Sequence, residues 1–227
     1  MRKLTLAVAL LALPLAFNAC DDDDDGPVTP PAPKASLNVT HTVPDLAPVD
    51  VLIDDSRMDE DLAYTNSTGY FQVNAGSHNV KLNAANTTNV IVQRDLSFPA
   101  DSKSSIFIVG TNTAVETLEI VDDLSAPTAG QAKVRFLHAS PTAPAIDFTT
   151  DAGTPVFTDY TFKEYSPFTS MDAGTYNFEV RPAGTSTVVY TMPNVVLAEG
   201  KIYTIYTKGL VNGTGDQAFG TELIVNN

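Results

Sequence analysis

An internal repeat constrains the fold of this 227-residue chain more than any other feature of its sequence. Similar segments lie about 97 residues apart, THTVPDLAPVDV in the first half and LHASPTAPAIDF in the second. A histidine, a proline and an aspartate recur in both, as His41, Pro44 and Asp50 and as His138, Pro141 and Asp147. A unit of this length has the size of a domain, so the sequence predicts two tandem domains rather than a solenoid.

Within each repeat, apolar residues alternate with polar ones, as a half-buried β-strand requires. The alternation includes both histidines and runs through Leu37, Val39 and His41 and through Val134, Phe136 and His138. Turn residues interrupt it about every 8 to 14 positions. Short strands cut by regular turns are typical of an antiparallel sandwich, so we predict an all-β fold with about seven strands in each domain.

The N-terminus has the order of a secretory signal peptide. Arg2 and Lys3 precede the apolar run from Leu4 to Phe17, and the chain's single cysteine, Cys20, follows. The ending resembles the lipobox of bacterial lipoproteins, which implies that Cys20 is acylated and becomes the mature N-terminus. An ordinary signal peptide followed by an unpaired thiol is the alternative.

Five consecutive aspartates, Asp21, Asp22, Asp23, Asp24 and Asp25, follow the cysteine. Like charges repel and the run offers nothing to bury, so we expect it to be extended and solvated. Its position is similar to that of the export signal of surface lipoproteins in some Gram-negative bacteria; a plain spacer and a loose calcium-binding tract are alternatives. The proline-rich residues GPVTPPAPK then form a stalk.

These features divide the chain into four parts. They are a signal peptide at 1–19, an acidic and proline-rich tether at 20–35, a diverged first sandwich at 36–124 and a second sandwich at 131–227. The net charge of −14 becomes −16 when residues 1–19, with two basic and no acidic residues, are removed. Such a charge argues against nucleic-acid binding.

The second half resembles the domain-of-unknown-function 4397 family. The residues that show this are AKVRFLHASPTAPAIDF, DAGTYNFEVRPAGT and LAEGKIYTIYTKGL. The first half keeps the His, Pro, Asp and Ala-Gly landmarks but has Thr42-Val43 where the family has Ala-Ser. The resemblance implies exported or lipid-anchored bacterial proteins with immunoglobulin-like sandwiches, and it brings no catalytic residues.

The two His and Asp landmarks could form acid–base pairs, because a carboxylate can orient an imidazole for proton transfer. However, each histidine shares the parity of core residues and lies three positions before a proline. A buried histidine bonded to loop backbone satisfies this pattern as well. Ser140 has no G-x-S-x-G context, and the histidines lack zinc-ligand spacing, so we expect neither an enzyme nor a cofactor.

Acidic residues are most concentrated in DDSRMDED, a segment predicted to be a hairpin loop. Carboxylates are calcium ligands, but the spacing matches no EF-hand, so we interpret the segment as solvated and keep calcium as the weaker alternative. The calcium candidates are Asp54, Asp55, Asp59 and Asp61.

Aromatic residues crowd one short stretch of the second repeat. Tyr160 and Tyr165 have opposite parity, and one strand of a sandwich has only one inward face. Some of these rings could therefore be exposed for recognition, whereas packing in the core or between domains is the alternative. The possible ligand surface comprises Tyr160, Tyr165 and Phe168.

Together these patterns predict a non-catalytic protein anchored in the outer membrane through acylated Cys20 and exposed at the cell surface. There it would act as a binding or adhesion module for a glycan, a peptide or a partner protein. The alternative function is a structural spacer or assembly component of an outer-membrane complex.

Overall fold

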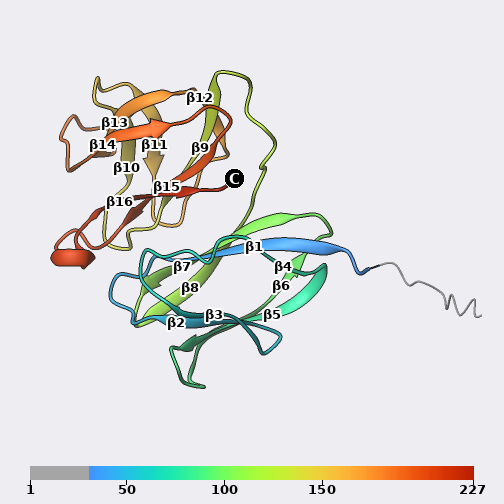
Figure 1. The fold of residues 1–227 in the computed structure, drawn as a ribbon. Helices are drawn as coiled ribbons and strands as arrows, with labels where there is room; N and C mark the ends of the chain where they lie inside the picture. Colours follow the sequence, from blue (N-terminus) through green and yellow to red (C-terminus); the bar gives the residue numbers. More distant parts are fainter. Residues whose placement is uncertain (1–30) are drawn as a thin grey trace, which may run out of the picture. The chain divides into compact units, whose positions relative to one another are not determined.

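The computed structural model describes residues 31–227, which contain sixteen β-strands and one 3-10 turn, η1 (Gly215–Gln217). The strands form two sandwiches of eight strands each. In Figure 1 the first sandwich is coloured from blue to green and the second from yellow to red. The tandem all-β prediction is confirmed, with one strand more per domain than turn spacing indicates. None of the helical structure in residues 31–227 is long and apolar enough to span a membrane.

The first sandwich consists of two four-stranded sheets that enclose one apolar core. Its strands are β1 (Lys34–His41), β2 (Val49–Ile53), β3 (Ser56–Leu62), β4 (Phe71–Asn74), β5 (Gly76–Ala84), β6 (Val90–Phe98), β7 (Lys103–Thr111) and β8 (Ala114–Val121). The strand orders are β4-β1-β7-β8 and β3-β2-β5-β6.

The second sandwich repeats this arrangement. Its strands are β9 (Gln131–His138), β10 (Ile146–Thr150), β11 (Pro155–Tyr160), β12 (Thr169–Asp172), β13 (Gly174–Pro182), β14 (Tyr190–Leu197), β15 (Ile202–Lys208) and β16 (Gly220–Val225). The orders are β12-β9-β15-β16 and β11-β10-β13-β14, so each strand corresponds to the one eight places earlier. The internal repeat is therefore a repeat of topology.

One pair of strands in each sandwich is parallel. The β1–β7 pair aligns Val39 with Ile106, and the β9–β15 pair aligns Phe136 with Ile205. The other pairings in residues 31–227 that link named strands are antiparallel, as predicted. Alternation within a strand cannot report the direction of its neighbour, because the period of two is the same in both arrangements.

The central strands β1, β7, β9 and β15 are buried on both faces. In β9 the inward residue Phe136 is 0% exposed, but the outward residues Arg135 and Leu137 are also 1% and 0% exposed. Continuous apolar runs are typical of strands covered on both sides. The alternation predicts one buried and one solvated face for β1 and β9, and this was wrong for both strands.

The outward faces of β7–β8 and of β9 and β15 share a third apolar cluster. Phe107, Val109 and Ile120 from the first sandwich belong to it together with Leu137, Ala139 and Tyr206 from the second. Residues 32–227 accordingly form one compact unit. The two sandwiches therefore pack against each other and are not joined by a linker alone.

Candidate functional site

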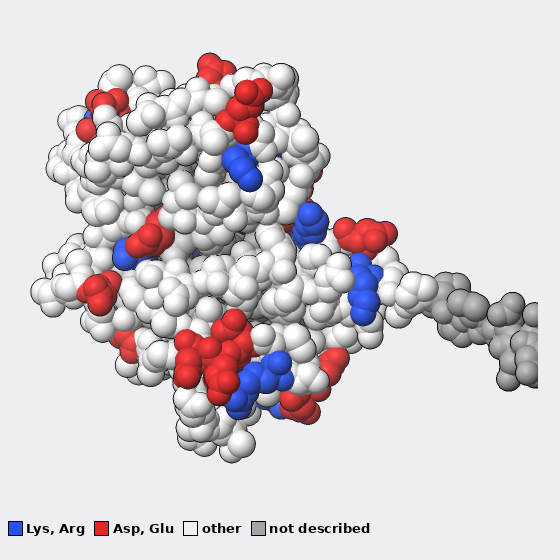
Figure 2. Space-filling view, in the orientation of Figure 1, with Lys and Arg blue, Asp and Glu red and all other residues white. Residues whose placement is uncertain are grey.

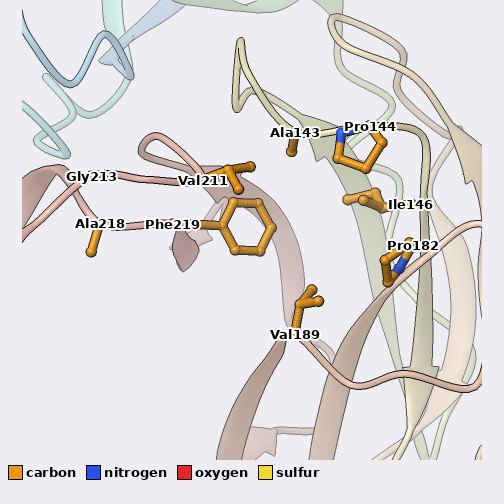
Figure 3. A pocket seen from close by; sticks show the side chains of 9 residues that line it. All are labelled: Ala143, Pro144, Ile146, Pro182, Val189, Val211, Gly213, Ala218 and Phe219. Carbon is orange, nitrogen blue, oxygen red and sulfur yellow. The ribbon is translucent and has the colours of Figure 1, made fainter.

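An apolar pocket of about 490 Å³ lies at one end of the second sandwich, where the β9–β10, β13–β14 and β15–β16 loops meet. Figure 3 shows the Phe219 ring, Ile146 and Val189 around the open space, with Pro144 and Pro182 on one side. The volume falls within the range of ligand sites, about 300 to 1,000 Å³. The lining consists of Ala143, Pro144, Ile146, Pro182, Val189, Val211, Gly213, Ala218 and Phe219.

Hydrogen bonds hold the loops around the pocket in place. Val211 N donates to Thr142 Oγ1 at 3.0 Å, which ties the β15–β16 loop to the β9–β10 loop. Ala183 N donates to the carbonyl of Ala145 at 2.8 Å, which ties the end of β13 to the start of β10. A ligand would therefore enter a preformed site and lose little entropy in ordering it.

Two glycines allow the β15–β16 loop to fold tightly. Gly209 has a φ of +76°, and a Cβ there would lie 2.1 Å from the carbonyl oxygen of Ala218. A Cβ on Gly213 would lie 2.1 Å from the carbonyl oxygen of Gln217. Because both distances are far below van der Waals contact, the loop depends on glycine at these positions.

The first sandwich lacks the corresponding loop. Strands β7 and β8 are joined by Asn112 and Thr113 alone, whereas residues 209–219 separate β15 from β16. The two copies thus differ most where the pocket forms. The sequence patterns above did not predict this site. The signal that points to it is GLVNGTGDQAFG, an insertion relative to the first repeat.

The chemistry of the lining restricts what can bind. None of the nine lining residues has a charged or hydrogen-bonding side chain. The one aromatic ring among them, that of Phe219, packs edge-on against Tyr190 with centroids 6.4 Å apart. Burying polar groups without partners is costly. The pocket therefore suits an uncharged apolar group better than a sugar or an ion.

A second, more open hollow contains two of the predicted ligand-surface residues. Tyr160 and Tyr165 line a space of about 370 Å³ together with Thr158, Asp159 and Glu164. Tyr165 is 44% exposed, whereas Tyr160 packs edge-on against Phe136 at a centroid distance of 5.6 Å. We call this site the tyrosine hollow.

Phe168 is not brought into the tyrosine hollow. Its ring lies 4.5 Å from the guanidinium carbon of Arg135, which is 1% exposed. This is a cation–π contact in a buried setting. Of the three predicted rings, Phe168 takes part in packing beside the interface between the two sandwiches.

The landmark histidines are buried and bonded to loop backbone. His138 Nε2 donates to the carbonyl of Pro144 at 3.0 Å, and Thr207 Oγ1 lies 3.3 Å from His138 Nδ1. His41 Nε2 similarly lies 3.4 Å from the carbonyl of Ala47. Burial lowers the pKa of both imidazoles below the usual value. The structural interpretation of these histidines is confirmed by these contacts.

The landmark aspartates brace loops with unusual backbone. Asp147 accepts hydrogen bonds from Asp159 N and Gly184 N, both at 2.9 Å. Asp159 and Gly184 have φ values of +61° and +70°, in the left-handed region. In the first copy, Asp50 likewise accepts hydrogen bonds from Asp61 N and Asn86 N, each at 3.1 Å. The carboxylates therefore hold strained turns rather than orient the histidines.

The acidic segment begins at a hairpin turn, as predicted, but most of it lies in a strand. Asp54 and Asp55, with φ of +49° and +62°, form its two-residue turn, and the rest belongs to strand β3. Asp54 accepts from His78 Nδ1 at 2.6 Å, Asp55 pairs with Lys81, and Asp61 accepts from Asn86 Nδ2 at 2.9 Å. Asp59 instead lies opposite Val51 in the β2–β3 pair. Within residues 31–227, no three His, Cys, Asp or Glu side chains are grouped as a metal site.

Charged side chains on the face drawn in Figure 2 lie in small, separated groups. Most basic groups there have acidic ones beside them, and much of the face carries neither. The predicted lipidation residue, Cys20, and the predicted export signal, the aspartates at 21–25, lie outside the described residues.

The family model of a domain of unknown function, DUF4397, matches residues 35–149 and 137–227. The chain therefore belongs to the DUF4397 family, in two copies, as its sequence motifs predict. A comparison with curated protein sequences finds no significant match.

Solved structures provide distant similarities. A family 26 carbohydrate-binding module of Eubacterium rectale Amy13K, crystallised with maltoheptaose, is 11% identical, with 85% of this chain and 95% of that chain covered and a TM-score of 0.26. An α-glucan-binding streptococcal virulence factor is 9% identical, with 78% and 92% covered and a TM-score of 0.24. Family 41 carbohydrate-binding modules from streptococcal virulence factors are 10% identical, with 82% and 96% covered and a TM-score of 0.25. At these TM-scores the similarities carry no argument about the site.

Proposed function

We propose that this protein is a non-catalytic binding module of the cell envelope, and that the apolar pocket of its second sandwich receives the ligand. The observation that supports this most is the β15–β16 loop, which builds a preformed pocket in one copy of an otherwise repeated fold. Maintaining an open apolar surface in water is unfavourable unless something covers it.

The ligand presents an uncharged apolar group, such as an aliphatic or aromatic side chain of a peptide or partner protein. The tyrosine hollow, with two phenol rings beside Asp159 and Glu164, offers hydrogen-bond acceptors and ring surface and is the place where a glycan would fit instead. We therefore assign a peptide or partner protein to the apolar pocket and a glycan to the tyrosine hollow.

The module is held at the outer membrane by acylated Cys20 and directed to the cell surface by the aspartates at 21–25. Several acyl chains anchor a protein firmly, whereas a single chain binds membranes marginally. The proline-rich stalk holds the sandwiches away from the lipid.

Paired substitutions of exposed valines test the pocket. Val189 directly precedes the edge strand β14, lines the pocket and is 48% exposed. Val196 lies within β14, is 63% exposed and does not line the pocket. Wild-type, Val189→Asp and Val196→Asp proteins are used to capture partners from the native outer membrane. We expect wild-type and Val196→Asp to retain the same partner and Val189→Asp to lose it. Equal retention by all three would contradict the assignment of the pocket.

Anchoring and export are tested separately. Cys20→Ala should release the protein from the membrane fraction or leave its precursor uncleaved, and hydrophobic retention without acylation would contradict the lipoprotein assignment. Replacing the five aspartates with alanine should preserve anchoring but reduce cleavage by protease added to intact cells. Unchanged access to protease would argue against the export signal.

A structural spacer is the second candidate. It is favoured by the buried ion pair between Asp122 and Arg135, which joins the two sandwiches with an N–O distance of 2.5 Å and would stiffen them. Stoichiometric copurification with an envelope complex, unaffected by Val189→Asp, would favour this candidate over ligand binding.

A further inference from the structure

The contact between the two sandwiches relates equivalent positions of the two repeats. Asn38 pairs with Ser105 in the β1–β7 register, and Arg135 pairs with Thr204 in the β9–β15 register. Asn38 and Arg135 each lie three residues before a landmark histidine, so they are equivalent, as are Ser105 and Thr204. Phe107 and Tyr206, two residues further on, are then equivalent as well.

Phe107 and Tyr206 touch each other. Their ring centroids lie 6.2 Å apart at an interplanar angle of 62°, and both side chains are 0% exposed. A residue that contacts its own counterpart lies on the two-fold axis of an isologous interface. The two copies therefore meet as the subunits of a symmetric dimer would, although they belong to one chain.

A closed cycle of hydrogen bonds lies beside the aromatic rings of Phe107 and Tyr206. Arg135 Nη1 donates to Asp122 Oδ1 at 2.5 Å, and Arg135 Nη2 donates to Thr204 Oγ1 at 3.0 Å. Thr204 Oγ1 donates to Asn226 Oδ1 at 2.8 Å, and Asn226 Nδ2 donates to the Tyr70 hydroxyl at 3.3 Å. The Tyr70 hydroxyl completes the cycle of hydrogen bonds by donating to Asp122 Oδ2 at 2.6 Å.

Burial keeps the Tyr70 hydroxyl protonated. Loss of hydration, together with the adjacent charge of Asp122, raises the pKa of Tyr70 to about 12. Tyr70 therefore remains a donor to the carboxylate at every physiological pH, and Ser105 Oγ supplies another donor at 2.7 Å.

The charged residues of this hydrogen-bond cycle are not related by the symmetry of the two copies. Asp122 follows the last strand of the first copy and donates its N–H to Lys103 O, and Asn226 follows the last strand of the second and donates to Ile202 O. The two positions are equivalent, so the first copy contributes Asp122 and Asn38 where the second contributes Asn226 and Arg135.

We propose that the Asp122–Arg135 pair makes this surface specific for pairing of the first copy with the second. Pairing two first copies about the same axis would bury two carboxylates without a guanidinium. Pairing two second copies would bury two guanidinium groups without a carboxylate. Because an unpaired buried charge is strongly unfavourable, both self-pairings are disfavoured, and a first copy pairs with a second copy. The connection between the two copies makes the second copy of the same chain the favoured partner.

Four full-length proteins test whether the two buried charges stabilise each other. They are wild type, Asp122→Asn, Arg135→Asn and the double variant. Each substitution installs the residue that the other copy has at the equivalent position, Asn226 for position 122 and Asn38 for position 135. We expect each single variant to lose roughly 6 to 20 °C of melting temperature, because one charge remains buried and unpaired. The double variant should lose less than either single variant. Losses that simply add would overturn the proposed coupling.

Self-association of the same four proteins tests the specificity part. After refolding at increasing protein concentration, light scattering with size exclusion should find wild type and the double variant monomeric. Asp122→Asn should dimerise through its neutral first copies and Arg135→Asn through its neutral second copies, because pairing within the chain leaves one charge without a partner in each. Single variants that are folded but remain monomeric at every concentration would overturn the selection. The exposed Lys163–Glu116 pair, 3.1 Å apart with side chains 39% and 58% exposed, provides the control. Changing both residues to glutamine should alter neither measurement.

Discussion

The imidazole of His138 donates from Nε2 to the carbonyl oxygen of Pro144 at 3.0 Å, and this bond connects the central strand β9 to a wall of the apolar pocket. The ring itself is 0% exposed. A buried polar group that fixes a loop carbonyl links the stability of the core to the geometry of the site. The same contact, at 3.4 Å, links His41 to Ala47 in the first copy, where no comparable loop completes a pocket.

His138→Ala should lower the free energy of unfolding by about 1 to 3 kcal/mol, because it removes the donor to Pro144 and leaves space in the core. His138→Gln, which can still donate to the carbonyl, should lose less. Both are measured by chemical denaturation. Full stability of His138→Ala combined with loss of a measurable reaction would make the histidine catalytic and defeat the structural assignment.

The buried histidines should make the protein less stable in mild acid. Both imidazoles have a lowered pKa when folded, so the unfolded chain takes up protons first as the pH falls below about 6.5. Their stabilising contribution is complete above that pH and declines as the pH falls toward the folded-state pKa values, with a slope of up to about 1.4 kcal/mol per pH unit for each histidine. Denaturation between pH 7.5 and 5 measures it, and a His41→Gln/His138→Gln variant should have a flatter profile. An equally steep profile in that variant would assign the effect to other groups.

Gly209→Ala should destabilise the protein more than Gly200→Ala. Both glycines have a φ of +76°, but a Cβ on Gly209 would meet the Ala218 carbonyl oxygen at 2.1 Å, whereas nothing lies within 4 Å of one on Gly200. The left-handed backbone costs each variant about 1 to 2 kcal/mol, and only Gly209→Ala adds the steric conflict in the β15–β16 loop. Thermal melting compares the two. Equal losses would show that the loop tolerates displacement.

Tyr165→Ala should change the free energy of unfolding by less than about 0.5 kcal/mol, because the side chain is 44% exposed. Tyr160→Ala, which removes a ring packed against Phe136 and Phe157, should cost about 1 to 3 kcal/mol. If a glycan binds in the tyrosine hollow, titration should show weaker binding by Tyr165→Ala despite its unchanged melting temperature. Unfolding of the second domain by Tyr165→Ala would instead place that ring in the core.

The sequence by itself determined the class of fold and the number of copies. The His, Pro and Asp landmarks repeat because each performs the same local task twice. The histidine bonds a carbonyl six residues later, and the aspartate caps two backbone N–H groups of turns. Such contacts occur within one domain and depend on residue type and spacing, so they leave a readable pattern.

Only the tertiary structure decided what covers the outer faces and where the pocket lies. The apolar runs around Phe107 and Tyr206 are visible in the sequence, but a period of two cannot identify the surface that packs against the second face of a strand. Arg135 looks like a solvated residue between Val134 and Phe136 until Asp122 is found beside it, 2.5 Å away. The pocket likewise depends on three loops that are distant in sequence and meet because the sheets bring the ends of their strands together. Contacts between segments far apart in the chain are set by packing, and local pattern does not record them.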